Sequence, residues 1–256
     1  MLVSKPSIRQ ADQGDSLSRP GGAPAITVRN LSYRYPNGHE ALRDVSLEIH
    51  AGEQIAFMGP NGAGKSTLLM HFNGILRGGD VQVHGVSIND TSVKRIRAQV
   101  GVVFQNPDDQ LFSPSVYDDV AYGPLYMGLP KTEIEQRVTR ALAAVDMAGF
   151  EERMPHQLSI GQRKRISLAT VLSMDLEILV LDEPSAGLDP RARRSLIELL
   201  KSLPQTLIVS SHDMRLVRDL CTRSIVMDTG RIAIDASTAD IIQDEDLLEQ
   251  YGLELP

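Results

Sequence analysis

The sequence predicts an α/β protein with a mostly parallel core sheet, an antiparallel β subdomain and a helical insertion. Short apolar runs separated by helical patterns are typical of parallel strands buried on both faces, and they occur at residues 55–58, 100–104, 178–181 and 207–209. Alternating apolar positions at residues 26–35 and 42–49, around the turn Pro36-Asn37-Gly38, predict an antiparallel pair. Residues 106–177 lack a strand pattern, which indicates the insertion.

Composition narrows the class of protein. Of the 256 residues, 42% are hydrophobic and 23% are charged, which is typical of a soluble globular chain. The formal net charge of −7 argues against a broad basic surface for nucleic acid. The single cysteine, Cys221, excludes a disulfide framework within one chain and suits a reducing compartment. Because we find neither a long apolar run nor a signal-peptide pattern, we expect a soluble intracellular protein.

The predicted organisation is a flexible N-terminal tail followed by one domain. Residues 1–24 are rich in Ser, Gly, Pro, Gln and Asp, a composition that cannot bury much surface. Residues 25–256 form the domain, with an α/β core at about 25–105 and 178–235 and a helical subdomain at about 106–177. Residues 236–256 supply a C-terminal helix and tail.

Helix and hairpin signals follow in chain order. Thr132-x-x-Glu135 matches a capping box before helically spaced apolar residues. A second helix of the insertion is predicted from Ser159 to Leu172. Asp228-Thr229-Gly230 separates two β-like segments and predicts a hairpin, and residues 239–250 predict one closing helix.

Residues 59–66 match the phosphate-loop pattern G-x-x-x-x-G-K-[ST] between a predicted strand and a predicted helix. Glycines allow successive backbone N–H groups to wrap phosphate oxygens, and the helix dipole adds to the attraction. The predicted nucleotide-binding residues are Gly59, Pro60, Asn61, Gly62, Ala63, Gly64, Lys65, Ser66 and Thr67. In this pattern Lys65 reaches the β- and γ-phosphates, and Ser66 ligates Mg²⁺. The alternative is a Gly-rich turn with a surface lysine, and kinases, GTPases and motor proteins share the loop.

Two carboxylates follow the apolar run at 178–181. Ligands of α/β proteins bind at the carboxyl edge of the sheet, where these residues are expected. Asp182 is a candidate for holding Mg²⁺ through its water shell, and Glu183 is a candidate general base for the attacking water. The alternative is a solvated strand end. Since a kinase has no need of a base for water, Glu183 favours hydrolysis.

Leu158-Ser159-Ile160-Gly161-Gln162 resembles the signature Leu-Ser-Gly-Gly-Gln of the ATP-binding-cassette (ABC) superfamily, with Ile160 in place of the first glycine. The resemblance implies that Ser159, Gly161 and Gln162 contact, in trans, the γ-phosphate held by a second copy. Arg163, Lys164 and Arg165 crowd the first turns of the predicted helix, where positive charge opposes the helix dipole. We interpret them as the surroundings of a bound anion, the alternative being a solvated basic face.

Further motifs appear in the order found in this family. Gln105 matches the Q-loop glutamine, which implies contact with Mg²⁺ and water, and His212 matches the switch histidine that senses the γ-phosphate. Tyr35 matches the aromatic residue that stacks on adenine. Asp189 lies in a segment that resembles the D-loop at the dimer interface, and with Pro190 it also fits a helix N-cap. The resemblance thus implies ATP and Mg²⁺ as ligands, with catalysis by Glu183, His212, Gln105 and Lys65.

Because the phosphate loop and the signature occur once, the family pattern implies a head-to-tail dimer, most simply a homodimer, that closes over two ATP molecules. Residues 104–112, 170–174, 182–190 and 247–256 resemble the energy-coupling-factor importers, in particular the cobalt and nickel (CbiO) branch. The implied function is ATP-driven import of a transition-metal ion, with cobalt preferred and nickel or a vitamin such as biotin as alternatives. Six histidines without ligand spacing predict that this chain does not bind the transported metal itself.

The resemblance also implies a transmembrane scaffold subunit, a substrate-binding membrane subunit and a peripheral position on the cytoplasmic face of the membrane. We expect residues 106–112 and 117–126 to form much of the groove for the scaffold's coupling helices, because apolar and aromatic residues gather there. These are Leu111, Phe112, Val116, Tyr117, Tyr122, Leu125 and Tyr126. Core packing is the alternative for each of them.

Two other classes of protein remain as alternatives. A soluble ABC ATPase of DNA repair, chromosome organisation or translation would share the motifs. Long coiled-coil insertions, a second cassette and basic charge would be expected there, and none is seen. A small-molecule kinase would share the phosphate loop but not residues 158–162.

Overall fold

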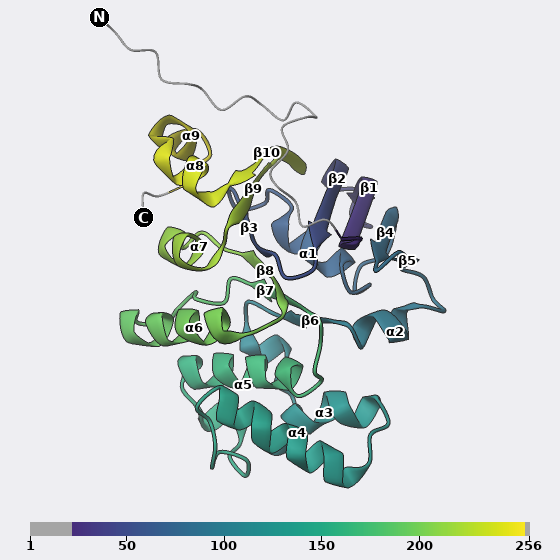
Figure 1. The fold of residues 1–256 in the computed structure, drawn as a ribbon, viewed down its shortest axis with the longest axis vertical. Coiled ribbons are helices and arrows are strands. Elements are labelled where there is room, and N and C mark those ends of the chain that lie inside the picture. Colours follow the sequence, from purple (N-terminus) through teal and green to yellow (C-terminus); the bar gives the residue numbers. More distant parts are fainter. Residues whose placement is uncertain (1–21, 254–256) are drawn as a thin grey trace, which may run out of the picture.

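The computed structural model describes residues 22–253, and Figure 1 shows their arrangement. The predicted N-terminal tail, residues 1–24, lies mostly outside the described residues, as do residues 254–256. At the start of the domain, Pro24 is already the first residue of strand β1 (Pro24–Arg34).

The core is a six-stranded sheet in the order β10-β9-β3-β8-β7-β6. Its strands are β3 (Gln54–Met58), β6 (Val100–Val103), β7 (Ile178–Asp182), β8 (Thr206–Ser210), β9 (Arg223–Asp228) and β10 (Arg231–Ser237). All neighbours pair in parallel except β10, which forms the predicted hairpin with β9. The predicted mostly parallel α/β core is therefore confirmed.

The apolar runs of the core strands follow from burial on both faces. In β3, Ile55 and Phe57 belong to one hydrophobic cluster, while Ala56 and Met58 belong to the other. Successive side chains of a strand point to opposite faces, so a sheet covered on both sides needs apolar residues at every position.

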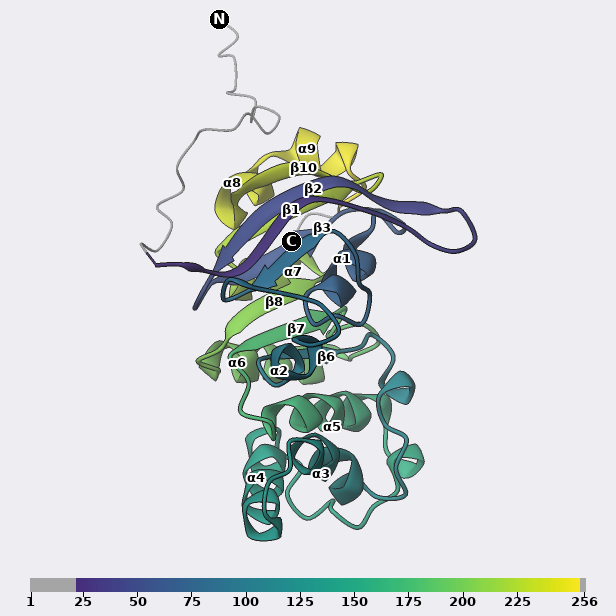
Figure 2. The same cartoon turned by 90° about the vertical axis from the view of Figure 1, so that its right-hand side faces the viewer.

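A second, four-stranded sheet has the order β2-β1-β4-β5. Strand β1 pairs antiparallel with β2 (Glu40–His50) as predicted, and on its other side with β4 (Asp80–Val83), which leads to β5 (Val86–Ser87). Helix α1 (Lys65–His71) lies between the two sheets, whereas α6 (Pro190–Ser202) and α7 (Met214–Leu220) cover the opposite face of the core sheet (Figures 1 and 2). Neither β4 nor β5 was predicted from the sequence.

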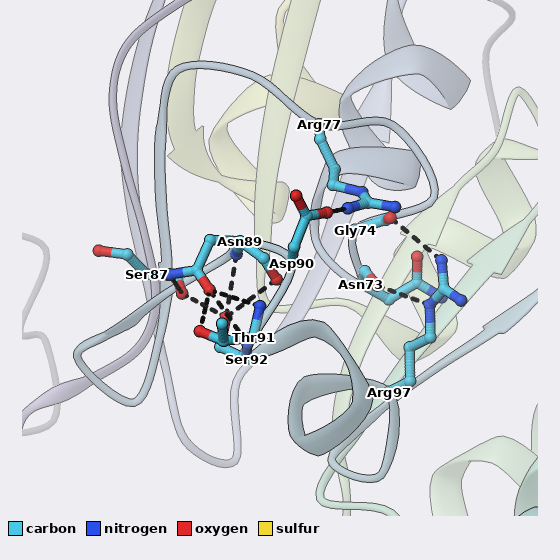
Figure 3. Close-up of polar contacts among 9 residues, drawn as sticks. All are labelled: Asn73, Gly74, Arg77, Ser87, Asn89, Asp90, Thr91, Ser92 and Arg97. Carbon is cyan, nitrogen blue, oxygen red and sulfur yellow. Dashed lines mark hydrogen bonds and ion pairs between the residues drawn. The ribbon is translucent and has the colours of Figure 1, made fainter.

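A polar cluster, rather than apolar periodicity, orders the connection from β5 to the short helix α2 (Val93–Arg97) (Figure 3). The side chain of Asn89 accepts hydrogen bonds from the backbone N–H groups of Thr91 and Ser92, at 3.0 Å each. Arg97 donates to the carbonyl of Gly74 at 3.1 Å and so ties α2 to the segment after α1. Such side-chain turns leave no periodic signal, which is why α2 was not predicted.

The predicted helical insertion consists of α3 (Val116–Tyr126), α4 (Lys131–Ala144) and α5 (Ile160–Leu172), with short 3₁₀ turns at 107–109 and 155–157. It forms the end of the molecule remote from α8 and α9 (Figure 1). The predicted capping box at Thr132 is wrong, because α4 begins at Lys131, and its N-cap, Pro130, has no side-chain cap. Pro130, in an extended conformation, precedes the first helical residue, and Thr132 lies inside the first turn.

The C-terminal segment forms two short helices, α8 (Thr238–Gln243) and α9 (Glu245–Gln250), where one helix was predicted. Asp244 separates them, and its side chain accepts a hydrogen bond from the N–H of Leu247 at 3.1 Å, which starts the new helix. Within residues 22–253 no helix is both long enough and apolar enough to cross a membrane.

Candidate nucleotide-binding site

The loop at residues 59–66 connects β3 to α1, as its sequence pattern requires. Gly59 and Gly64 have φ angles of 129° and 101°, which favour glycine. A Cβ atom on Gly59 would lie 2.0 Å from the carbonyl oxygen of Met227, and one on Gly64 would lie 2.6 Å from that of Ala41. Neighbouring backbone therefore clamps the loop, and only glycine fits at these two positions.

Lys65 lies at the start of α1 with its ammonium group folded back over the loop. Its Nζ atom donates to the carbonyls of Gly59 at 2.7 Å and Pro60 at 3.0 Å. Burial lowers the pKa of Lys65 from its ordinary value, while the carboxylates of Glu183 and Asp182 act in the opposite direction. The cation thus lies inside the loop with only neutral carbonyls as hydrogen-bond partners, so an anion that enters the loop would find it available.

Tyr35 extends from the end of β1 to the same helix. Its hydroxyl lies 3.1 Å from Oγ1 of Thr67, within hydrogen-bond distance. The ring of Tyr33 packs edge-on against Tyr35 at 5.1 Å and against His71 at 4.8 Å. Tyr35 lies one residue beyond β1, and its contact with Tyr33 orients the Tyr35 ring.

Asp182 is the last residue of β7, which ends beside β8, and Glu183 follows it. Both side chains are largely buried. Glu183 has a φ angle of 46°, and its N–H donates to the carbonyl of Ser210 at 2.9 Å. The left-handed conformation costs a residue with a side chain about 1–3 kcal/mol. The sheet holds it there, and the bend turns the Glu183 carboxylate toward the loop after β8.

That loop carries His212, whose Nδ1 atom lies 2.8 Å from Oε2 of Glu183. The histidine side chain is 69% exposed, whereas that of the glutamate is 10% exposed. Asp213, the next residue, caps α7 by accepting from the N–H of Leu216 at 3.2 Å. The geometry therefore pairs a buried carboxylate with an imidazole at the mouth of the site.

Lys164, on α5, holds the backbone at Glu183, a role that was not predicted from the sequence. Its Nζ atom donates to the carbonyls of Glu183 at 3.0 Å and Pro184 at 3.2 Å. Burial lowers the pKa of Lys164, against the opposing effect of the Glu183 and Asp182 carboxylates. The signal was present in the sequence, because Lys164, Leu168 and Val171 share one helical face, and the last two are apolar.

Residues 163–165 have partners within the chain, so their positive charge does not by itself indicate a bound anion. Arg163 pairs with Asp108 at 2.5 Å, and Arg165 pairs with Asp146 at 2.9 Å. Lys164 is bound to the two carbonyls described above. All three cations have partners within the chain, and these partners account for positive charge at the start of α5.

Most of the predicted nucleotide-binding residues line one open pocket of about 270 Å³. Its lining residues are Tyr35, His39, Ala41, Asn61, Gly62, Ala63, Gly64, Lys65, Ser66, Thr67, Gln105, Glu183, Ser210 and His212. Strand β6 ends at Val103, one residue earlier than predicted, so Gln105 lies two residues beyond the strand. The structure thus brings together the loop, the adenine-site candidate and the candidate catalytic side chains.

The residues predicted to act in trans do not line this pocket. Ser159 caps α5 in a capping box with Gln162, with N–H to side-chain distances of 2.9 Å and 3.3 Å. Asp189 caps α6 and accepts from the N–H groups of Arg191 and Ala192 at 2.8 Å and 3.0 Å. These bonds lower the pKa of the Asp189 carboxyl. Ser159 and Asp189 are exposed, so both caps remain accessible to another molecule.

The carboxyl edge of the sheet has ligands suited to Mg²⁺. The Oδ1 atom of Asp182 is buried without a hydrogen-bond partner, and a buried carboxylate oxygen without one is costly. Ser66 and Gln105 line the adjacent pocket with further oxygen atoms. Hard oxygen ligands are those that Mg²⁺ selects, so the residues present fit this ion.

The predicted partner groove divides into surface and core. Phe112, Tyr122, Leu125 and Tyr126 have exposed fractions of 53–69%. The rings of Phe112 and Tyr122 pack edge-on at 5.2 Å, which makes an exposed aromatic patch on the helical insertion. Leu111 and Val116 are instead buried in the main hydrophobic cluster, with Tyr117 packed partly against it, so core packing explains these residues.

Comparison with known proteins finds chains similar to this one. A family model described as ABC transporter matches residues 42–186. A putative ABC transporter ATP-binding protein of Streptomyces avermitilis is 49% identical, over 91% of this chain and 90% of that protein. The energy-coupling factor transporter ATP-binding protein EcfA of Methanothermobacter thermautotrophicus is 44% identical, over 90% of this chain and 76% of that protein.

Two solved structures resemble the fold closely. The structure of cbiO1 from Clostridium perfringens, part of the ABC transporter complex cbiONQ, is 37% identical with a TM-score of 0.78 and covers 91% of this chain and 96% of its own. The dimeric cassette MJ0796 with ADP and Pi bound, in a post-hydrolysis state, is 27% identical with a TM-score of 0.75. That match covers 83% of this chain and 98% of the other.

Proposed function

The chain belongs to the ABC transporter family, and from that premise we propose that it powers the import of a transition-metal ion, cobalt first, across a membrane. It is an ATPase of the energy-coupling-factor (CbiO) type, in which ATP hydrolysis is coupled to transport. The observation that carries the proposed mechanism is the pocket itself, in which the phosphate loop faces the Glu183–His212 pair.

In the proposed chemistry, Tyr35 stacks on adenine, and residues 59–67 bind the phosphates. Glu183 accepts a proton from the water that attacks the γ-phosphate, His212 contacts that phosphate, and Gln105 orients the water. Mg²⁺, when bound, neutralises charge on the phosphates; Ser66, Gln105 and Asp182 would hold it, Asp182 through water. The buried, unpartnered oxygen of Asp182 supports this assignment.

We propose further that the working unit is a head-to-tail homodimer of one-domain chains, each domain comprising residues 25–256. Ser159 lies outside the pocket of its own chain, and this supports a site completed by a second copy. The partner copy would supply Ser159, Gly161, Gln162 and Asp189 to each ATP. The dimeric MJ0796 structure is similar and supports the same arrangement.

The proposed membrane partners are a transmembrane scaffold subunit and a substrate-binding subunit, with this chain peripheral on the cytoplasmic face. The similarity to cbiO1, part of a cbiONQ complex, and to EcfA supports such an assembly. The exposed aromatic patch of Phe112, Tyr122, Leu125 and Tyr126 is the proposed surface for the scaffold. The transported metal would bind to the membrane subunits rather than to this chain.

Uptake by the intact complex in sealed vesicles tests the cargo. Cobalt, nickel and biotin are compared with ATP inside the compartment that this chain faces. We expect ATP-dependent accumulation of cobalt, and its loss when the ATPase subunit carries Lys65→Ala. Uptake of biotin without uptake of either metal would overturn the metal assignment and leave the ATPase assignment standing.

A further inference from the structure

The rings of Tyr35 and His39 lie nearly parallel at the nucleotide pocket. Their planes are 16° from parallel, and their centroids are 6.5 Å apart. Both residues line the pocket. Of the pair, only Tyr35 was expected to contact a nucleotide, since a lone histidine in a turn carries no sequence signal.

The spacing of the two rings matches the thickness of a nucleobase. Carbon atoms in contact lie about 3.5 Å apart, so two rings that stack on opposite faces of one flat base are separated by about 7 Å. The 6.5 Å between the centroids of Tyr35 and His39 is close to this value.

The backbone holds both ring-bearing residues in place. The N–H of Tyr35 donates to the carbonyl of His39 at 2.8 Å, and the N–H of Gly38 donates to the carbonyl of Tyr35 at 2.9 Å. The side chain of Asn37 accepts from the N–H of His39 at 3.0 Å. The turn between β1 and β2 is thus closed by three hydrogen bonds, and the Tyr35 hydroxyl is anchored to Thr67 at 3.1 Å. Such preorganisation reduces the entropy lost on binding.

From this geometry we propose that His39 stacks on the second face of the adenine, so that Tyr35 and His39 clamp the base between them. This inference rests on the assignment of the pocket to ATP made above. Stacking requires a flat ring and no particular hydrogen bond, so phenylalanine can replace His39 in this role. His39 should therefore increase the binding affinity only of ligands that carry a base.

The test is isothermal titration of the full-length chain with ATP and, in parallel, with inorganic tripolyphosphate, which has the phosphates but no base. We expect His39→Ala to weaken ATP binding about fivefold, the low end for one aromatic–base stack, and to leave tripolyphosphate binding unchanged. His39→Phe should restore ATP affinity. His156→Ala, which removes an exposed histidine far along the chain outside the pocket, is the matched control and should bind both ligands as the unchanged chain does.

Three results would overturn the clamp: unchanged ATP affinity in His39→Ala, an equal loss of tripolyphosphate affinity, or no recovery in His39→Phe. Tyr35→Ala and Lys65→Ala separate this failure from a failure of the proposed site. If both weaken ATP binding while His39→Ala does not, the pocket binds ATP and only the role of His39 is wrong. If neither weakens it, the nucleotide site itself is misassigned.

Discussion

The Nδ1 atom of His212 lies 2.8 Å from Oε2 of Glu183, so an exposed imidazole holds the buried carboxylate that follows β7. Lys164 holds the backbone of the same glutamate from the opposite side, through the carbonyls of residues 183 and 184. Because His212 belongs to the loop after β8 and Lys164 to α5, the position of Glu183 depends on both the core and the helical insertion. A shift of either part changes how Glu183 is held.

Glu183→Gln should retain ATP affinity and lose most turnover. The amide keeps the shape of the side chain but cannot accept the proton of the attacking water, and a general base contributes about 100-fold or more to rate. Phosphate release measures turnover, and light scattering with ATP present should detect a trapped dimer. Glu198→Gln, an exposed carboxamide replacement on α6, is the control. Near-normal turnover of Glu183→Gln would remove the assignment of the base.

Lys164→Met should lower kcat more than it changes the KM for ATP, because Lys164 positions Glu183 and does not line the pocket. The change removes this donor from the buried carbonyl of Pro184, whereas that of Glu183 still accepts from the N–H of Ala186 at 3.2 Å. The free energy of unfolding should therefore fall by about 1–3 kcal/mol. Steady-state kinetics and urea unfolding measure the two effects. Lys201→Met, an exposed position, should change neither. A Lys164→Met chain with the kcat of the unchanged chain would contradict the positioning role.

Phe112→Glu should prevent assembly with the membrane subunits while basal ATPase activity of the isolated chain persists. The ring is 69% exposed, so the charge is tolerated by the fold but not by an apolar contact with a partner. Co-purification from membranes is the measurement, with Lys201→Glu on α6 as a control that also adds negative charge. Normal assembly of the Phe112→Glu chain would show that this patch is not the contact surface.

Arg223→Met should destabilise the fold strongly. The guanidinium is 7% exposed and binds Glu53 at 3.1 Å and Asp235 at 2.6 Å, joining β9, β10 and the start of β3. Removal of the cation from a buried ion group costs about 3–5 kcal/mol, because the mostly buried Glu53 and Asp235 carboxylates would lose it with little water to replace it. Urea unfolding should show this loss for Arg223→Met and almost none for Arg218→Met, whose side chain is 48% exposed. If Arg223→Met lost no more stability than Arg218→Met, the ion group around Arg223 would be solvated and not buried.

Cys221 should be almost unreactive in the folded chain. Burial raises the pKa of its thiol to about 12, so at pH 8 the folded state holds it protonated while the unfolded state forms thiolate more readily. Because the unfolded chain then binds fewer protons, this group lowers stability as pH rises from about 8.5 toward 12. Alkylation at pH 8 with and without urea measures the difference. Equal rates would contradict the burial of this residue.

Local sequence determined the strands of the core, the phosphate loop and the helix cap at Asp189. Each depends on residues close together in the chain: apolar runs, a glycine pattern, or a side chain that bonds the next turn. These signals need no knowledge of distant contacts, and the fold confirms them. By contrast, β4, β5 and α2 depend on pairing with β1 and on a cluster of polar turns, which a single segment does not reveal.

Only the tertiary structure decided which side chains meet. Leu111 is buried in the main hydrophobic cluster, whereas the adjacent Phe112 is exposed, although both are apolar. Likewise Lys164 approaches the carbonyl of Glu183, and His39 faces Tyr35, through packing and a closed turn rather than through composition. Side-chain type follows from the sequence, but distance and burial follow from long-range strand order and helix packing, and chemistry at this site requires both.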